Sequence, residues 1–311
     1  MHKPSWWRDG KVLVVNAGTC GINKDGHEQY TVDPDTGKRS NEIDDSLAEC
    51  CDSVVQGDYS RKEIFYCDYE ELLKKDIFVP KYYDRKTLSG IESLIEKSEE
   101  FLLLSLGELQ NKKIIGIWGG HGSPSVDQRT GEIPYIKVSD LRAGHVNINP
   151  TNMVPLELAK QFWKKGIGSG DQNLSSSGLR AYDLISPERA SKNIGEFCVL
   201  MPGQENAVLT KEVIIIRSID SEYFDQFYLM WALSLQEVRK QWDRIVFMQT
   251  NREDVGKRML EIKIPVPKNL EIANKYAKSF KDYYMSLEKS RKKFIKDLKS
   301  SGFEHHIFLE S

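Results

Sequence analysis

The last part of the chain carries the sequence pattern that most constrains its fold. Between residues 269 and 300, apolar side chains recur at a 4-3-4-3 spacing, the heptad seam of a coiled coil, and Arg291 interrupts that seam. A helix of this span is about 45 Å long. It either folds back on its own domain or projects and pairs with another helix, and its length behind a proline-bounded β segment favours projection and pairing. The seam positions are Ala273, Ala277, Phe280, Tyr284, Leu287, Phe294 or Ile295, and Leu298.

Residues 101–267 show a different pattern, in which short β-like runs alternate with polar loops. The runs are KKIIGIWG, IPYIKVSDL, EFCVLMP, VLTKEVIIIRSI and LEIKIPVP, and one helix is expected from about Asp220 to Trp242. This mixture predicts an α/β (α+β) fold, mixed and largely antiparallel. The long, coiled-coil-like helix at residues 268–301 and a tail at 302–311 follow this domain.

Residues 1–83 are expected to form a separate small α/β segment. KVLVVN at residues 11–16 and the later EQYTV predict two strands with a turn between them. Because so few strands do not make a sheet of ordinary size, this segment is expected to depend on the rest of the chain or on a partner. Residues 84–100, with Ile91, Leu94 and Ile95 at helical spacing, predict a helical connector.

Composition and charge narrow the class of protein. With 40% hydrophobic and 29% charged residues, the chain resembles a globular protein; it has no apolar run of roughly 18 residues and no signal peptide, so the cytoplasm is the expected compartment. Residues 1–100 hold 14 Lys and Arg against 21 Asp and Glu, whereas residues 101–311 hold 30 against 25. Any contact with nucleic acid is therefore expected to be local and to lie in the second part.

The five cysteines give no sign of a metal centre or a disulfide framework. Their number is odd, no C-x-x-C spacing occurs, and reduced thiols are expected. A zinc site from Cys50, Cys51 and Cys67 would need two adjacent ligands, which is poor geometry. We expect no metal and no cofactor on this chain.

The glycine-rich loop GGHGSPS at residues 119–125 is tested first as a catalytic or phosphate-binding element. A phosphate-binding loop needs Lys-Ser or Lys-Thr after its last glycine and then a helix, but here Ser-Pro-Ser and a strand follow. Ser123 or Ser125 could act as a nucleophile with His121 nearby, yet the G-x-S-x-G elbow is missing. The sequence therefore favours neither a phosphate-binding loop nor a serine nucleophile here.

A metal-dependent nuclease is the second enzymatic alternative. Glu261 and Lys263 form an E-x-K pattern on a predicted strand, and Asp254 or Asp243 could supply a further carboxylate. Alternation places Glu261 and Lys263 on the outward face, where solvated charges are the ordinary expectation.

Several ordered landmarks resemble one known family. FLLLSLGEL, GGHGSPS, GEIPYIKVSDL and, after a long variable stretch, MQTNREDVGKRMLEIKIPVP are similar to the successive landmarks of the target recognition domain in specificity subunits of type I restriction-modification systems. The resemblance spans residues 101–267. It implies a protein that binds double-stranded DNA and in which long helices orient the recognition domains.

The N-terminal segment resembles a second component of such systems. KVLVVNAGTCGINKDGHEQYTVDPDTGK is similar to the end of the catalytic domain in adenine-specific DNA methyltransferases. The N-P-P-Y or D-P-P-Y motif and the glycine-rich S-adenosylmethionine loop of that family are absent. The resemblance therefore implies that S-adenosylmethionine and methyl transfer belong to a partner methyltransferase subunit.

Three groups of residues are predicted to contact DNA, each with an ordinary alternative. The first lies at GGHGSPS and where IPYIKVSDLR leaves the sheet, which is also consistent with a solvated edge strand. The second is the Gly- and Ser-rich stretch 164–180, which is equally consistent with a linker. The third precedes a helical turn, where Thr250 and Arg252 could hold a phosphate or Asn251 and Asp254 could form a capping box. The candidates are Gly120, Ser123, Lys137, Ser139, Arg142, Lys164, Lys165, Gln172, Asn173, Arg180, Thr250, Asn251 and Arg252.

The function expected from these patterns is that of a non-catalytic specificity subunit. It would bind double-stranded DNA and direct an adenine methyltransferase, with a restriction subunit as a further partner and a homodimer through the long helix. The alternatives are the recognition tail of a split methyltransferase-nuclease and a nuclease that uses Glu261 and Lys263.

Overall fold

The computed structural model describes residues 3–23, 25–147, 149–164, 167, 176–189, 191–249 and 252–305. Contacts between residues divide the chain into an N-terminal unit, Met1–Lys86, and a C-terminal unit, Thr87–Ser311. Each unit is described by itself. Among the described residues, no helix is both long enough and apolar enough to cross a membrane.

The N-terminal unit contains two small antiparallel sheets, β1 with β4 and β2 with β3. Helix α1 begins where the Asp45 carboxylate accepts a hydrogen bond from the Ala48 N–H at 2.9 Å, and it ends at Gly57, whose φ of +81° favours glycine. Two-stranded sheets agree with the small strand number expected from the sequence. The elements are β1 (Lys11–Val15), β2 (Tyr30–Val32), β3 (Arg39–Ile43), α1 (Ser46–Gln56), β4 (Ile64–Asp68), α2 (Tyr69–Lys75) and the 3-10 helix η1 (Pro80–Tyr83).

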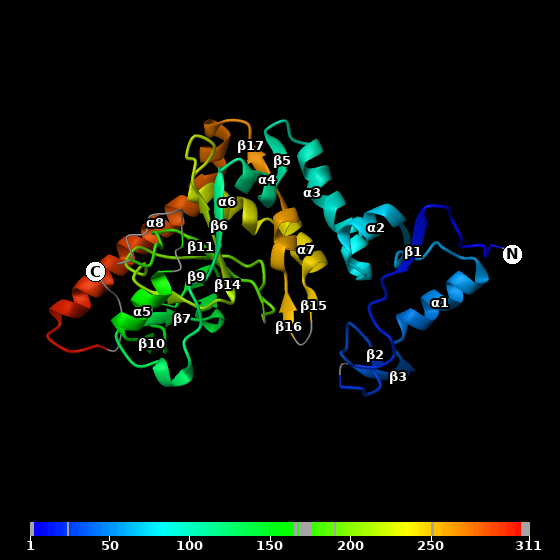
Figure 1. Ribbon diagram of the computed structural model, residues 1–311, viewed down its shortest axis with the longest axis horizontal. Helices are drawn as coiled ribbons and strands as arrows, with labels where there is room; N and C mark the ends of the chain where they lie inside the picture. The colour runs from blue at the N-terminus through cyan, green and yellow to red at the C-terminus, as the bar shows by residue number, and fades with distance from the viewer. Residues whose placement is uncertain are drawn as a thin grey trace. The chain divides into compact units, whose positions relative to one another are not determined.

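The C-terminal unit combines several sheets with helices, as Figure 1 shows. Its helices are α3 (Lys86–Glu96), α4 (Leu106–Asn111), α5 (Leu156–Trp163), α6 (Gln226–Ser234), α7 (Gln236–Ile245) and α8 (Leu270–Ser300), with the 3-10 helices η2 (Val126–Gln128), η3 (Val138–Asp140) and η4 (Gly256–Glu261). Its strands are β5 (Phe101–Ser105), β6 (Ile115–Gly119), β7 (Ile133–Ile136), β8 (Leu141–Arg142), β9 (His145–Val146), β10 (Met153–Val154), β11 (Leu184–Pro187), β12 (Cys198–Val199), β13 (Val208–Leu209), β14 (Val213–Ser218), β15 (Phe247–Gln249), β16 (Arg252–Asp254) and β17 (Lys263–Pro267).

The largest sheet has the strand order β6-β14-β11-β12-β9-β8. All of its neighbouring pairs are antiparallel except β12 with β9. The other sheets of this unit are the three-stranded sheet β10-β7-β13 and the antiparallel pairs β17-β5 and β15-β16. The predicted fold class is confirmed: a mixed α+β fold with largely antiparallel sheets and a long C-terminal helix.

A buried ion pair lies at the end of the pairing between β14 and β11. The Arg217 guanidinium on β14 donates to both carboxylate oxygens of Asp183, each at 2.6 Å, and to the Gly178 carbonyl at 2.9 Å. Both charged side chains are almost fully buried. Arg217 thereby connects the sheet to the segment that leads into β11.

The first half of α8 packs on its own domain, against α6 and β17. Ala273, Ala277 and Tyr284 are buried there, and the Tyr284 O–H donates to the Gly144 carbonyl at 3.0 Å. The predicted helix is confirmed, but its projection is wrong for this half, because the small seam residues allow close approach to α6. Phe294, in the second half, is 44% exposed.

Two element boundaries differ from the sequence prediction. The helix expected from Asp220 to Trp242 is two helices, α6 and α7, because Leu235 has the extended backbone angles φ −60° and ψ 135°. The strand predicted for IPYIKVSDL ends at Ile136, and the 3-10 helix η3 follows it.

Candidate nucleic-acid interface

His121, in the middle of the glycine-rich loop, is buried and bonded on both ring nitrogens. Its Nε2–H donates to the Ser177 carbonyl at 2.7 Å, and its Nδ1 accepts from the Leu209 N–H at 2.9 Å. Burial lowers the pKa of the imidazole to about 4, although the Ser177 carbonyl acts in the opposite direction. Both nitrogens of this neutral ring are occupied, so His121 is not available as a base for Ser123 or Ser125 in this arrangement.

The glycines of this loop allow close packing within the domain. A Cβ on Gly120 would lie 1.9 Å from the Thr210 carbonyl oxygen, and one on Gly122 would lie 2.4 Å from the Phe162 ring. The Gly120 N–H donates to the Val213 carbonyl at 3.0 Å. The glycines are therefore explained by the approach of the chain to itself, and a contact of Gly120 with DNA stays a prediction.

Thr210 brings three of the predicted residues into one neighbourhood. Its hydroxyl lies 3.1 Å from that of Ser123, its carbonyl packs on Gly120, and its N–H donates at 3.0 Å to Ile136, the residue before Lys137. Sequence patterns gave no signal for Thr210, because the elements it joins are far apart in the chain. We call the exposed or half-exposed side chains of Ser123, Lys137, Ser139 and Arg142 the polar edge.

The conformation of the polar edge differs from the predicted strand. Lys137 and Ser139 were expected on one face of a strand, but Val138–Asp140 is a 3-10 turn, because the Asp140 carboxylate accepts from the Lys137 N–H at 2.9 Å. Ser139 and Arg142 are exposed. The Arg142 guanidinium donates to the Leu141 carbonyl at 2.8 Å and binds no carboxylate in the described part of the chain.

The second predicted group is described only at its ends. Lys164 is exposed where α5 ends, and Arg180 is exposed next to the buried Asp183, which accepts the Arg180 N–H at 2.8 Å. Three further candidates lie outside the described residues: Lys165, Gln172 and Asn173. Their contact with DNA remains a prediction.

Only Arg252 of the third group is described, and it lies in a strand. Thr250 and Asn251 are outside the described residues. Arg252 begins β16, which pairs with β15 in antiparallel register, Arg252 opposite Gln249. Asp254 is also in this strand and η4 begins only at Gly256, so Arg252 and Asp254 do not stand at the start of a helix as expected. Contact of Thr250, Asn251 and Arg252 with DNA stays a prediction.

The E-x-K pattern does not form a catalytic pair. Glu261 ends the 3-10 helix η4, and the Arg244 guanidinium lies 3.2 Å from its carboxylate. The Lys263 ammonium instead binds Glu92 at 3.1 Å. No group of three or more His, Cys, Asp and Glu side chains suited to a metal ion occurs in the parts of the chain that are described.

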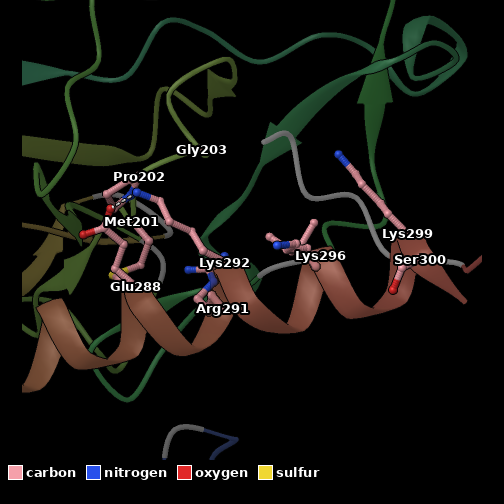
Figure 2. A pocket seen from close by; sticks show the side chains of 10 residues that line it. Met201, Pro202, Gly203, Glu288, Arg291, Lys292, Lys296, Lys299 and Ser300 are labelled. Atoms are coloured by element: carbon pink, nitrogen blue, oxygen red, sulfur yellow. Dashed lines mark hydrogen bonds and ion pairs between the residues drawn. The ribbon is translucent and has the colours of Figure 1, made fainter.

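A further cationic surface lies at the end of α8, and no predicted site residue belongs to it. Arg291, Lys292, Lys296 and Lys299 line a cavity of about 790 Å³ together with the turn at residues 201–203 (Figure 2). Residues 287–300 contain six Lys and Arg against two Asp and Glu. The spacing of Lys292, Lys296 and Lys299, which places them on one helix face, is a signal that could have revealed this surface.

Among known proteins, this chain is similar to solved structures, but no protein-family model and no curated protein sequence matches it. A type I restriction-modification S subunit from M. genitalium is similar over 62% of this chain and 41% of its own, with TM-score 0.41 and 11% identity. The HsdS subunit from Thermoanaerobacter tengcongensis is similar over 63% and 40%, with TM-score 0.38 and 16% identity. The type IIG restriction endonuclease BpuSI is similar over 70% and 30%, with TM-score 0.43 and 10% identity. The chain spans less than half the length of each of these proteins.

Proposed function

We propose that this chain is a non-catalytic DNA-binding specificity subunit that directs an adenine methyltransferase to its target sequence. The polar edge is the observation that carries the proposal. Through Thr210, Ser123 of GGHGSPS lies beside the backbone that leads into Lys137 of GEIPYIKVSDL, and both of these sequence landmarks resemble those of target recognition domains. The resemblance itself covers more than half of the chain.

The chemistry of the polar edge suits a DNA groove. Lys137 and Arg142 carry the charges that bind phosphates or guanine edges, while Ser123 and Ser139 offer hydroxyls to bases or phosphates. The backbone beneath these side chains is held by Thr210 and Asp140 through hydrogen bonds of about 3 Å. A rigid support of this kind keeps the reading side chains in register with the DNA.

Methyl transfer belongs to a partner chain in this proposal. The chain lacks the amine-orienting motif and the glycine-rich S-adenosylmethionine loop of adenine methyltransferases, so the partner supplies both cofactor and catalysis. The N-terminal unit, which resembles the end of such an enzyme, is the part that docks on it. A restriction subunit joins the same cytoplasmic complex.

Selection of bound DNA tests the proposal. The chain is co-purified with a candidate methyltransferase subunit, the complex is mixed with random-sequence duplexes, and the retained DNA is sequenced. Enrichment of one short motif is expected, and a motif split into two halves indicates two recognition domains in the complex.

A matched pair of variants connects the result to the polar edge. The double variant Lys137→Ala, Arg142→Ala is expected to weaken binding and to lower the salt-dependence slope by about one for each lost phosphate contact. Lys112→Ala, which removes an exposed charge at the end of α4, is expected to leave the motif and the affinity unchanged. A complex that enriches no sequence, or a double variant that binds like the parent, contradicts the proposal.

A further inference from the structure

The cavity at the end of α8 lies between the second half of this helix and the turn Met201–Gly203. Figure 2 shows side chains of successive helix turns, among them Lys292 and Arg291, on the side of the helix that faces this turn. Its volume of about 790 Å³ falls within the range of roughly 300–1,000 Å³ that small-molecule sites occupy. A phosphate ion alone fills only a small part of such a space.

The charges around the cavity do not balance. Its one acidic side chain, Glu288, already accepts a hydrogen bond from Lys292 at 2.5 Å and one from the Tyr182 hydroxyl at 2.6 Å. Among the described residues, Lys296 and Lys299 form no ion pair. The cavity wall therefore carries positive charge that the surrounding described chain leaves uncompensated.

Arg291 is the most unusual of these cations. Its Nη2 atom is buried and has no hydrogen-bond partner within the described ranges. Burial also lowers the pKa of the guanidinium, which nevertheless stays charged in proteins. An N–H group taken out of water without a partner costs free energy. The rest of the Arg291 side chain is half-exposed and lines the cavity, so its positive charge is available to an anion with oxygen acceptors.

Apolar groups form the rest of the wall. Met201, Pro202 and Ile295 face the same space, and the methylene stems of the lysines add to this surface. The cavity thus combines donors for an anion with a surface suited to a flat, weakly polar body. A nucleotide has both parts.

We propose that this cavity binds a nucleotide, with its phosphate at Arg291, Lys296 and Lys299 and its base against Met201, Pro202 and Ile295. The nucleotide is either a free mononucleotide or one residue of a DNA strand. The DNA source rests on the proposed function, whereas a free nucleotide would be a ligand independent of sequence recognition.

Calorimetric titration of the full chain tests the proposal. The probes are the four 5′-mononucleotides, the four matching nucleosides, inorganic phosphate, and short single-stranded and duplex DNA. At least one mononucleotide or DNA probe is expected to bind more tightly than inorganic phosphate and than the nucleosides. Arg291→Met and Lys299→Ala are each expected to weaken that binding about tenfold or more, since each removes a charged donor.

Lys293→Ala is the matched control, because Lys293 lies on the same helix with the same charge but does not line the cavity. Lys299 is exposed, so its variant tests the site without disturbing a buried group. Binding of mononucleotides that depends on Arg291 identifies a free ligand, and binding of DNA alone with that dependence identifies the DNA source. If no probe binds, if phosphate binds as well as nucleotides, or if Lys293→Ala weakens binding as much as Lys299→Ala, the proposal is wrong. DNA selection through the polar edge can still succeed in each of these cases, so the two failures are distinguishable.

Discussion

Two arginines of the C-terminal unit occupy buried or half-buried positions with opposite electrostatic surroundings. Arg217 lies in the large sheet, donates twice to Asp183 and once to a carbonyl, and stacks over Trp118 with its guanidinium carbon 5.2 Å from the ring centroid. Arg291 lies in the second half of α8, where its Nη2 has no partner in the described part of the chain. Hydrogen bonds within the protein satisfy the first guanidinium, whereas the described residues offer no acceptor to the Nη2 of the second.

The difference indicates which parts of the molecule serve stability and which are available for a ligand. A buried charge that finds its partner inside the protein fixes the local structure, and losing one member leaves the other charged and unpaired. A half-buried charge with an unsatisfied N–H group contributes little to the fold and leaves a donor without an acceptor inside the described part of the protein.

Arg217→Met is expected to have the largest effect, a loss of about 3–5 kcal/mol in the free energy of unfolding, because Asp183 stays buried without its cation. Urea unfolding of the full chain, followed by fluorescence, measures the change. The double variant Arg217→Met, Asp183→Asn removes both charges and is expected to recover a large part of the loss. A single variant that unfolds at the parent's urea concentration would show that the pair does not stabilise the sheet.

His121 provides a pH-dependent test of a second buried group whose hydrogen bonds are made within the protein. Its pKa is about 4 in the folded protein against 6.5 for an unperturbed histidine, because burial disfavours the charged ring. The stability from the neutral ring is fully present above pH 6.5 and is lost as the pH falls toward 4, by about 3 kcal/mol in total.

Urea unfolding at intervals between pH 7.5 and pH 4.5 measures this loss. His121→Gln, which does not titrate, is expected to show a shallower decline over the same interval, although it is less stable at neutral pH. Parallel declines in the two proteins would mean that His121 is not the group responsible.

Gly120→Ala tests the backbone of the core, with an expected loss of about 2 kcal/mol from overpacking. The new Cβ would lie 1.9 Å from the Thr210 carbonyl oxygen, so the chain must shift at Thr210 and, with it, at Ser123. Gly119→Ala is the matched control, since a Cβ there meets nothing within 4 Å. Thermal unfolding of both variants separates them, and equal melting temperatures would contradict the packing described for Gly120.

Much of the fold could be predicted from the sequence, because periodicity reports which face of an element is buried. The heptad spacing predicted a helix over residues 269–300, where α8 spans Leu270–Ser300, and KVLVVN predicted β1. The heptad spacing does not distinguish packing of Ala273 and Ala277 on a helix of another chain from packing on α6, since small apolar residues suit both contacts. The strand predicted for IPYIKVSDL was too long. Asp140 closes a turn through a local hydrogen bond to the Lys137 N–H, which the alternation of apolar and polar residues does not reveal.

The candidate site was less accessible to sequence reasoning. Ser123 and Lys137 are predicted to contact DNA, and that contact stays a prediction; their neighbourhood depends on Thr210, which is 87 residues from Ser123. His121 was tested as a catalytic base, and its actual partners, Ser177 and Leu209, are equally remote in sequence. Arg291 was recognised as an interruption of the seam, but only the structure shows that a cavity lies beside it.

Arg291→Met is expected to have the smallest effect on stability, within about 1 kcal/mol of the parent or slightly stabilising, because replacing an unpaired charge with an apolar group of similar length removes a desolvation cost. Arg217→Met and Arg291→Met can be compared directly, since each variant replaces a guanidinium group with the same apolar side chain. Urea unfolding measures each in the absence of ligand. A mononucleotide that binds the parent, added at a free concentration of ten times its dissociation constant, should then raise the parent's free energy of unfolding by about 1.4 kcal/mol and leave that of Arg291→Met nearly unchanged. A loss for Arg291→Met as large as that for Arg217→Met would mean that the guanidinium at the end of α8 has a structural partner after all, and the distinction between the two regions would fail.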